Sequence, residues 1–216
     1  MDGGSGDVLY CQYSVCEVKT MIAFTCTAEE ALAKLRRGNE AFFTRETPLG
    51  DVSPRLRLKS CEQGQKPYAI VICCSDSRVL PEGLFSAGIG ELFVIRVAGN
   101  VIDNHQLGSI EYAAEHLGCP LVLVLGHDHC GAVDAAIRHD PDGYIKFITD
   151  EIREAIGEER DPRRASCLNV CHSLRRIEES LAIRADEEQG LRLIGALYEL
   201  QSGRVRFLDE EGCPCD

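Results

Sequence analysis

Three residues in two short segments are of the types that hold transition metals. Cys74 begins the segment Cys-Ser-Asp-Ser-Arg, and His127 and Cys130 lie within the segment Gly-His-Asp-His-Cys-Gly. Thiolates and imidazole match the borderline softness of zinc, which accepts them in a tetrahedral arrangement. A histidine and a cysteine at this spacing are a weak signal alone, but three ligands that leave a fourth position open are typical of a catalytic zinc site. We therefore expect Cys74, His127 and Cys130 to bind one zinc ion.

Two charged residues, Asp76 and Arg78, lie two and four positions beyond Cys74. On an exposed surface such an ion pair contributes little to stability. Beside a metal it can act as a gate, in which Asp76 either occupies the fourth zinc position or pairs with Arg78. The pairing lets water in and leaves the carboxylate able to orient a hydroxide. We favour the gate, and we expect Asp76 and Arg78 to be catalytic.

Short apolar runs precede both segments and predict the strands that position them. The runs are rich in Val, Ile and Leu and cover residues 68–73, 92–97 and 121–125. Their continuous apolarity favours strands buried on both faces, hence a parallel sheet. Helical patterns at residues 81–87 and 107–117 complete an α/β fold with a central, mostly parallel sheet flanked by helices. In such a sheet, sites form beyond the carboxyl ends of the strands, which would bring the three ligands together.

An N-terminal helical arm is predicted ahead of these strands. Thr27 to Glu30 is a capping box, in which each end of the motif satisfies a free backbone amide of the other. The helix that follows would place four apolar residues on one face: Ala31, Leu32, Leu35 and Phe42. We expect a linker after this helix, because Pro48 and Pro54 lie there.

The sequence beyond Gly131 predicts further helices and then two strands. Apolar residues recur at helical spacing over 150–157 and 165–181. Residues 192–200 and 204–208 are typical of two strands joined by a turn at Ser202 and Gly203.

Composition and charge exclude several classes of protein. The chain has 216 residues, of which 35 are acidic and 23 are Lys or Arg, so its formal net charge is -12. Because such a surface repels phosphate backbones, we expect no nucleic-acid partner. Its apolar runs fall well short of the ~20 residues of a membrane-spanning helix, and its first residues do not resemble a signal peptide. We expect a cytoplasmic protein with no membrane association, in which most of the twelve cysteines are buried apolar side chains.

Five segments together resemble the β-class carbonic anhydrases. They are CSDSRV at 74–79, FVIRVAGNV at 93–101, GSIEYAAEHL at 108–117, GHDHCGAV at 126–133 and IGALYELQSGRVRFL at 194–208. The resemblance implies reversible hydration of CO2 to bicarbonate and a proton by zinc-bound hydroxide. It also implies one zinc per subunit and a homodimer that can pair into a tetramer. We assign residues 27–208 to this catalytic domain, 1–26 to a poorly ordered N-terminal extension and 209–216 to a C-terminal tail.

The resemblance also implies a role for each site residue. Cys74, His127 and Cys130 would be the zinc ligands, and Asp76 and Arg78 the gating pair. The substrate-binding residues would be Gln65, Phe93, Ala98, Tyr112 and Gly131. Gln65 would reach the substrate across the dimer interface, although an exposed loop glutamine is the alternative. Phe93 and Tyr112 could equally be core residues.

One family feature is expected to be missing. Val71 stands where some bacterial members carry a Trp that belongs to an inhibitory bicarbonate site. Together with Gln65, this favours a resting form that is open and carries water on the metal.

Two other functions remain open from the sequence. The same scaffold could hydrolyse carbonyl sulfide or carbon disulfide, or the chain could be a structural-zinc or redox-sensing protein. His105 or His129 could carry the proton that hydration releases. Cys213 and Cys215, in the tail, could bind a metal or form a disulfide, but a disordered end is favoured.

Overall fold

A five-stranded sheet forms the centre of the computed structural model, which describes residues 21–44, 50–138 and 141–208. The strands are β1 (Ala69–Cys73), β2 (Leu92–Arg96), β3 (Leu121–His127), β4 (Arg192–Tyr198) and β5 (Val205–Phe207). Their order across the sheet is β2-β1-β3-β4-β5. The first four run parallel and only β5 is antiparallel to its neighbour. The predicted α/β class with a mostly parallel sheet is confirmed.

The two strands that precede the predicted ligands are neighbours at the centre of the sheet. Every residue of β1 and of β3 is buried, as their continuous apolar sequences predict. Cys73, the last residue of β1, pairs with Leu125 of β3. The chain therefore leaves both strands at the same edge of the sheet, where Cys74 and His127 lie.

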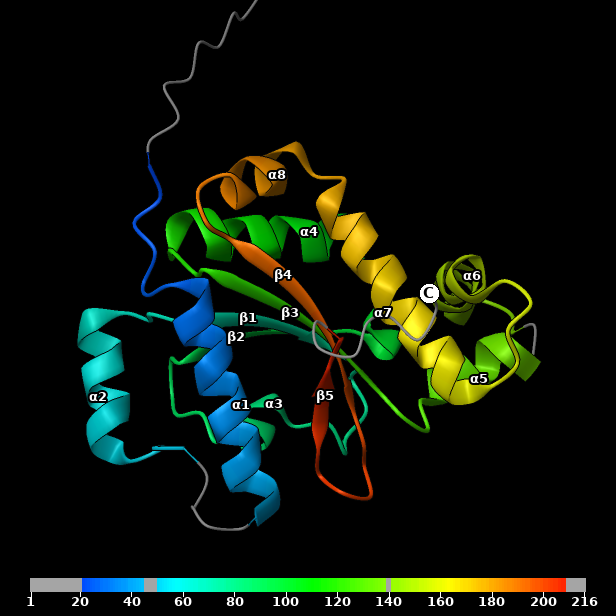
Figure 1. Cartoon of the computed structure of the whole chain (residues 1–216), viewed down its shortest axis with the longest axis horizontal. Coiled ribbons are helices and arrows are strands. Elements are labelled where there is room, and N and C mark those ends of the chain that lie inside the picture. Colours follow the sequence, from blue (N-terminus) through cyan, green and yellow to red (C-terminus); the bar gives the residue numbers. More distant parts are fainter. Residues whose placement is uncertain (1–20, 45–49, 139–140, 209–216) are drawn as a thin grey trace, which may run out of the picture.

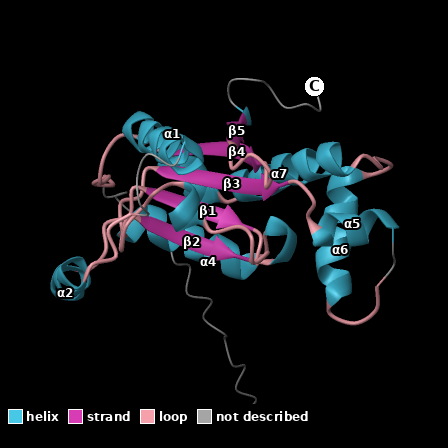
Figure 2. Ribbon diagram, turned by 90° about the horizontal axis from the view of Figure 1, so that it is seen from below, coloured by secondary structure: helices cyan, strands magenta, loops and turns pink. Residues whose placement is uncertain are grey.

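Helices cover both faces of this sheet (Figure 1). They are α1 (Ala28–Thr44), α2 (Pro54–Gln63), α3 (Pro81–Leu84), α4 (Asn104–Glu111), α5 (Gly131–Arg138), α6 (Ile145–Ile156), α7 (Pro162–Glu178) and α8 (Leu181–Glu187), with a 3-10 turn η1 (Ala98–Asn100) and a π-helical turn η2 (Tyr112–His116). On one face α1 and α3 pack against alternate residues of β1 and β3, such as Val71 and Leu123. On the other face α4, η2, α7 and α8 pack against the intervening residues, such as Ile72 and Val124. Figure 2 shows α5 and α6 beyond the carboxyl ends of the strands.

The predicted start of the first helix is confirmed in detail. The Thr27 amide donates to Glu30 Oε2 at 2.9 Å, and the Glu30 amide donates to Thr27 Oγ1 at 3.1 Å. Ala31 and Leu35 are buried on the predicted apolar face. Ahead of the helix, the Thr25 amide donates to Gly118 O at 2.8 Å, so the chain contacts the sheet domain before residue 27.

The segment predicted as a linker contains a helix, which corrects the sequence-based expectation. Ser53 caps α2 by accepting a hydrogen bond from the Leu56 amide, and Pro54 occupies its first turn. Every residue of α2 is at least partly exposed. The helix therefore has no buried apolar stripe, and the periodicity that reveals most helices is missing from its sequence.

Two further helices differ from the prediction near their ends. The helix expected to run to Leu117 leaves the α-helical pattern at Tyr112, where η2 begins. The helix expected over 165–181 ends at Glu178, and Ser180 caps the separate helix α8. Within the described residues, no helix is long and apolar enough to cross a membrane. Cys213 and Cys215 lie outside the described residues.

Candidate metal centre

Cys74, His127 and Cys130 come together at the carboxyl edge of the sheet. Cys74 follows β1, His127 is the last residue of β3, and Cys130 directly precedes α5. All three are buried, with exposed fractions of 5%, 1% and 4%. Their ligand atoms all lie within 4.8 Å of one another. The fold thus unites two loops that are more than fifty residues apart in the sequence.

The distances within this cluster fit a tetrahedral metal. The two sulfur atoms are 4.0 Å apart, and two thiolates about 2.3 Å from a tetrahedral zinc would lie about 3.8 Å apart. His127 Nδ1 is 2.7 Å from Asp128 O, a contact that fixes the ring and its tautomer. His127 Nε2 is buried, and among the described residues it has no hydrogen-bond partner. A buried nitrogen left without a partner is unfavourable, so a cation facing Nε2 accounts for this arrangement.

The Cys74 sulfur lies among groups that stabilise a thiolate. It accepts hydrogen bonds from the backbone amides of Gly99 at 3.3 Å and Asp76 at 3.4 Å. The neighbouring Cys130 thiol, His127 and these amides outweigh burial and lower the pKa of Cys74 to about 4. The hydrogen bond with Cys74 and burial raise the pKa of Cys130, so the pair holds one negative charge readily. A cation bound by the two sulfurs would supply the charge that lets both thiols ionise.

The turn that donates to Cys74 needs glycine. Gly99 has a φ of 67°, in the left-handed region. A Cβ atom there would lie 2.7 Å from Ile152 Cδ1 and 3.1 Å from Ala132 Cβ. Asn169 Nδ2 donates to Gly99 O at 2.7 Å, and Ser173 Oγ donates to Asn100 O at 2.9 Å. These bonds anchor the turn to α7.

The predicted charged pair is formed. Arg78 Nε donates to Asp76 Oδ1 at 2.9 Å and Arg78 Nη2 to Asp76 Oδ2 at 2.7 Å. The guanidinium holds the pKa of Asp76 well below its usual range. Asp76 Oδ2 is also 4.0 Å from His127 Nε2. The carboxylate therefore lies at the mouth of the cluster while bound to Arg78.

Sequence reasoning missed several residues that hold these loops. Arg96 Nη2 donates to Asp76 O at 2.8 Å, and Asp128 Oδ1 accepts from the Leu200 amide at 2.9 Å. Asn169 and Ser173 are polar yet buried in α7. Asn169 and Ser173 are four positions apart and lie on the helix face that carries Val170 and Ile177. This spacing was the one signal available in the sequence, because polar residues on an apolar helix face usually have a specific hydrogen-bonding role.

The structure places the predicted substrate-binding residues in three locations. Phe93 on the edge strand β2 and Tyr112 at the start of η2 have ring centroids 6.2 Å apart. Ala98 precedes Gly99 in η1, and Gly131 is the exposed first residue of α5, next to Cys130. Ala98 and Gly131 therefore lie at the carboxyl edge with the metal ligands, whereas Phe93 pairs with Ile70 near the amino end of β1.

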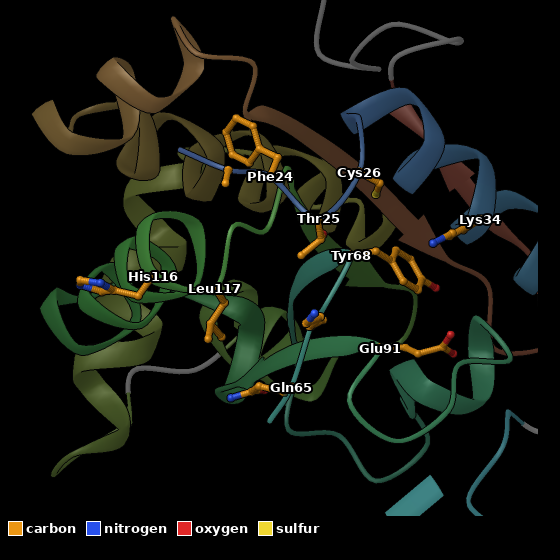
Figure 3. Close-up of a pocket in the computed structure, with 11 residues that line it drawn as sticks. Phe24, Thr25, Cys26, Lys34, Gln65, Tyr68, Glu91, His116 and Leu117 are labelled. Carbon is orange, nitrogen blue, oxygen red and sulfur yellow. The ribbon is translucent and has the colours of Figure 1, made fainter. Parts of the chain in front are cut away.

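Gln65 lies at the opposite end of the sheet. It precedes β1, whereas Cys74 follows it, so the length of a five-residue strand, about 16 Å, separates the two ends. There it lines a hollow of about 510 Å³ together with Tyr68 and Glu91. Figure 3 shows Gln65 at the rim of this hollow. Within one chain, the structure does not bring Gln65 to the metal ligands.

The two histidines considered as proton carriers differ in position. His105, near the start of α4, is 95% exposed and is 3.4 Å from Asp103. His129 lies between the ligands His127 and Cys130 with a φ of 51°, and its carbonyl oxygen accepts from Arg78 Nη2 at 3.1 Å. The backbone of His129 thus belongs to the site.

Comparison with known proteins shows which family this chain matches. Residues 69–205 match the family described as carbonic anhydrase. Carbonic anhydrase 2 of Mycobacterium tuberculosis is 36% identical over 196 residues, which cover 82% of this chain and 91% of that protein. The carbonic anhydrase of Mycolicibacterium smegmatis is 36% identical over 190 residues, covering 82% and 92%.

Solved structures agree with these relatives. A β-carbonic anhydrase of the fungal pathogen Aspergillus fumigatus superposes with a TM-score of 0.67 at 28% identity, covering 84% of this chain and 90% of that chain. A β-carbonic anhydrase of Sordaria macrospora, described as tetrameric, has a TM-score of 0.61 at 26% identity and covers 74% and 92%.

Proposed function

The chain belongs to the β-carbonic anhydrase family, and from that premise we propose that it is a zinc-dependent carbonate dehydratase, which interconverts carbon dioxide and water with bicarbonate and a proton. The observation that carries the proposal is the buried cluster of Cys74, His127 and Cys130, in which His127 Nε2 has no hydrogen-bond partner among the described residues. A zinc ion held there would lower the pKa of its bound water to about 7 and would so supply hydroxide at neutral pH.

The residues around the cluster orient the reacting groups. The Asp128 carbonyl holds the His127 ring with Nε2 facing the two sulfurs. Arg78 fixes the Asp76 carboxylate with two hydrogen bonds and keeps it ionised. In that position Asp76 accepts a hydrogen bond from the attacking oxygen. This hydrogen bond orients a lone pair of the oxygen toward the carbon atom of carbon dioxide. Because Arg78 holds Asp76, this carboxylate would not compete with water for a zinc ion held by Cys74, His127 and Cys130.

Substrate binding requires an apolar surface, because carbon dioxide is small and uncharged. Phe93, Tyr112 and Ala98 supply such side chains on the side of the sheet that β2 borders. Gly131, beside Cys130, offers a backbone position with no side chain in the way of an anion.

Gln65 takes part only if a second copy of the chain brings it to the site. Its position at the amino ends of the strands requires this arrangement. Since Tyr112 is 47% exposed and β2 is an edge strand, we propose a homodimer that covers this side, with a tetramer as the larger assembly.

Hydrolysis of carbonyl sulfide or carbon disulfide is the alternative reaction. Both are linear molecules that differ from carbon dioxide mainly in size and polarisability. The relatives reported above are named carbonic anhydrases, and they give this alternative no support.

Turnover of all three substrates by one zinc-loaded preparation tests the proposal. We expect stopped-flow assays with a pH indicator to show rapid hydration of carbon dioxide, and sulfide release from the other two to be slower by orders of magnitude. Faster hydrolysis of carbonyl sulfide or carbon disulfide than of carbon dioxide would reject the proposal.

A further inference from the structure

A second group of metal-binding side chains lies outside the cluster described above. Glu151 and Glu154 of α6 and His172 of α7 place one ligand atom each within 4.8 Å of the others. The two glutamates are three positions apart, so they occupy one face of α6. His172 faces them from the neighbouring helix, and the group therefore spans the contact between α6 and α7.

The state of the His172 ring points to a cation. Its side chain is only 13% exposed, and its Nε2 atom is buried without a hydrogen-bond partner among the described residues. Glu151 Oε2 is 3.6 Å away, beyond hydrogen-bond range. Two ligands about 2.0–2.1 Å from a tetrahedral zinc lie about 3.3 Å apart, close to the observed separation. His127 at the first cluster shows the same condition, a buried Nε2 facing anionic ligands.

The donor set determines the kind of ion. One imidazole nitrogen and two carboxylate oxygens suit zinc and the neighbouring first-row divalent metals. Two carboxylates also balance the charge of a divalent cation. The basic residues of α6, Lys146 and Arg153, both contact Asp150, 3.0 Å and 3.6 Å away. Without thiolates, such a site binds zinc less tightly than a cysteine-containing cluster.

We propose that Glu151, Glu154 and His172 form a second divalent-cation site, which takes zinc and clamps α6 to α7. The clamp supports the turn at Gly99. Ile152, next to Glu151, packs where a Gly99 side chain would lie, and Asn169, one turn before His172, donates to Gly99 O. An ion at this site therefore stabilises the scaffold beneath Cys74 without touching the reacting groups. The inference does not depend on the reaction that the first cluster carries out.

Zinc stoichiometry of the full-length protein tests the second site. After equilibrium dialysis against micromolar zinc, we expect two zinc ions per wild-type chain, one of which a weak chelator removes first. His172→Gln and Glu154→Gln should each bind one. Glu154 is exposed, so its variant keeps the fold, and His105→Gln is a matched control that should bind two.

Cobalt distinguishes this site from the cysteines. The first equivalent of Co²⁺ should give the near-ultraviolet charge-transfer absorption of thiolate ligands. The second should add only weaker bands of nitrogen and oxygen ligation, and these should disappear in Glu154→Gln.

In Cys74→Ser, zinc at about 100 times its dissociation constant should raise Tm by about 5 °C, and adding His172→Gln should abolish the shift. A single zinc per wild-type chain, or a second zinc that persists in both variants, would overturn the proposal.

Discussion

The two ends of the parallel strands differ in a way that locates the chemistry. At the amino ends lies a hollow of about 510 Å³, lined by polar and apolar residues such as Lys34, Tyr68 and Glu91. At the carboxyl ends, three ligand atoms converge in a buried cluster. Convergent donor atoms, rather than the volume of a depression, therefore mark the candidate site.

Electrostatics follow the same division. At the carboxyl end, the Cys130 thiol, the adjacent His127 ring and two backbone amides stabilise the Cys74 thiolate and lower the pKa of Cys74 to about 4. At the amino end, burial and the nearby Glu91 raise the pKa of Tyr68, so its hydroxyl keeps its proton. The Lys34 ammonium lies 4.8 Å from the centroid of the Tyr68 ring. One end is organised to hold a cation between anions, whereas at the other Lys34 lies over an uncharged ring and Glu91 accepts a hydrogen bond from the Gly88 amide.

The largest expected effect comes from removing a ligand at the carboxyl end. Cys74→Ser should lose tightly bound zinc and reduce carbon dioxide hydration to the uncatalysed rate, because serine does not replace a thiolate as a zinc ligand. Metal analysis and stopped-flow assays on the same preparation measure both. Cys61→Ser, at an exposed position, is the control and should retain both. Full activity in Cys74→Ser would show that the carboxyl-end cluster is not the catalytic site.

A smaller loss is expected at the charged pair. Asp76→Asn and Arg78→Gln should keep zinc but lower kcat by about 10- to 100-fold, the usual effect of losing a group that orients a metal site. Asp103→Asn, 63% exposed in its side chain, is the control. Unchanged kcat in both variants would show that the pair is a surface salt bridge with no role in catalysis.

Gln65 tests whether the two ends meet in an assembly. If a second copy carries Gln65 to the metal centre, Gln65→Ala should lower kcat/KM by about fivefold, since one hydrogen bond to a substrate contributes about 1 kcal/mol. Gln63→Ala, an exposed neighbour at the end of α2, should have no effect. Equal kcat/KM values in both variants would show that Gln65 does not contact the substrate of a second copy.

The smallest effect is a pH-dependent difference in stability. Arg78 lowers the pKa of Asp76, so the pair stabilises the folded state above the ordinary carboxyl pKa of about 3.9 and ceases to do so as pH falls through the lowered value. Urea unfolding of metal-free wild type and Arg78→Gln should therefore show a difference at pH 6 that shrinks toward pH 3. Metal-free protein is used because acid also releases the ion. A difference that grows as the pH falls would contradict the sign of this shift.

Much of the fold could be predicted because it depends on local patterns. The buried runs of β1 and β3 and the capping box at Thr27 identify their elements directly. Helix α2 could not be predicted from periodicity, because it has no buried face. The π-helical turn that follows α4 depends on tertiary packing, which no local residue pattern reports.

The site divides in the same way. Cys74, His127 and Cys130 could be predicted because two cysteines and a histidine in such segments are a combination typical of metal binding. Arg96 and Asp128 could not, because each acts through a hydrogen bond to a segment distant in sequence, as between Asp128 and the Leu200 amide. Gln65 shows the limit of a single chain, since its role depends on which surface a second copy covers.

The most direct test is to titrate zinc back into protein that a chelator has stripped, and to follow carbon dioxide hydration by stopped flow at each zinc content. We expect negligible catalysis without zinc, a rate that rises linearly with the first equivalent per chain, and no further rise with a second. Wild-type rates in the stripped protein, or a rate that does not follow the first equivalent, would contradict this expectation.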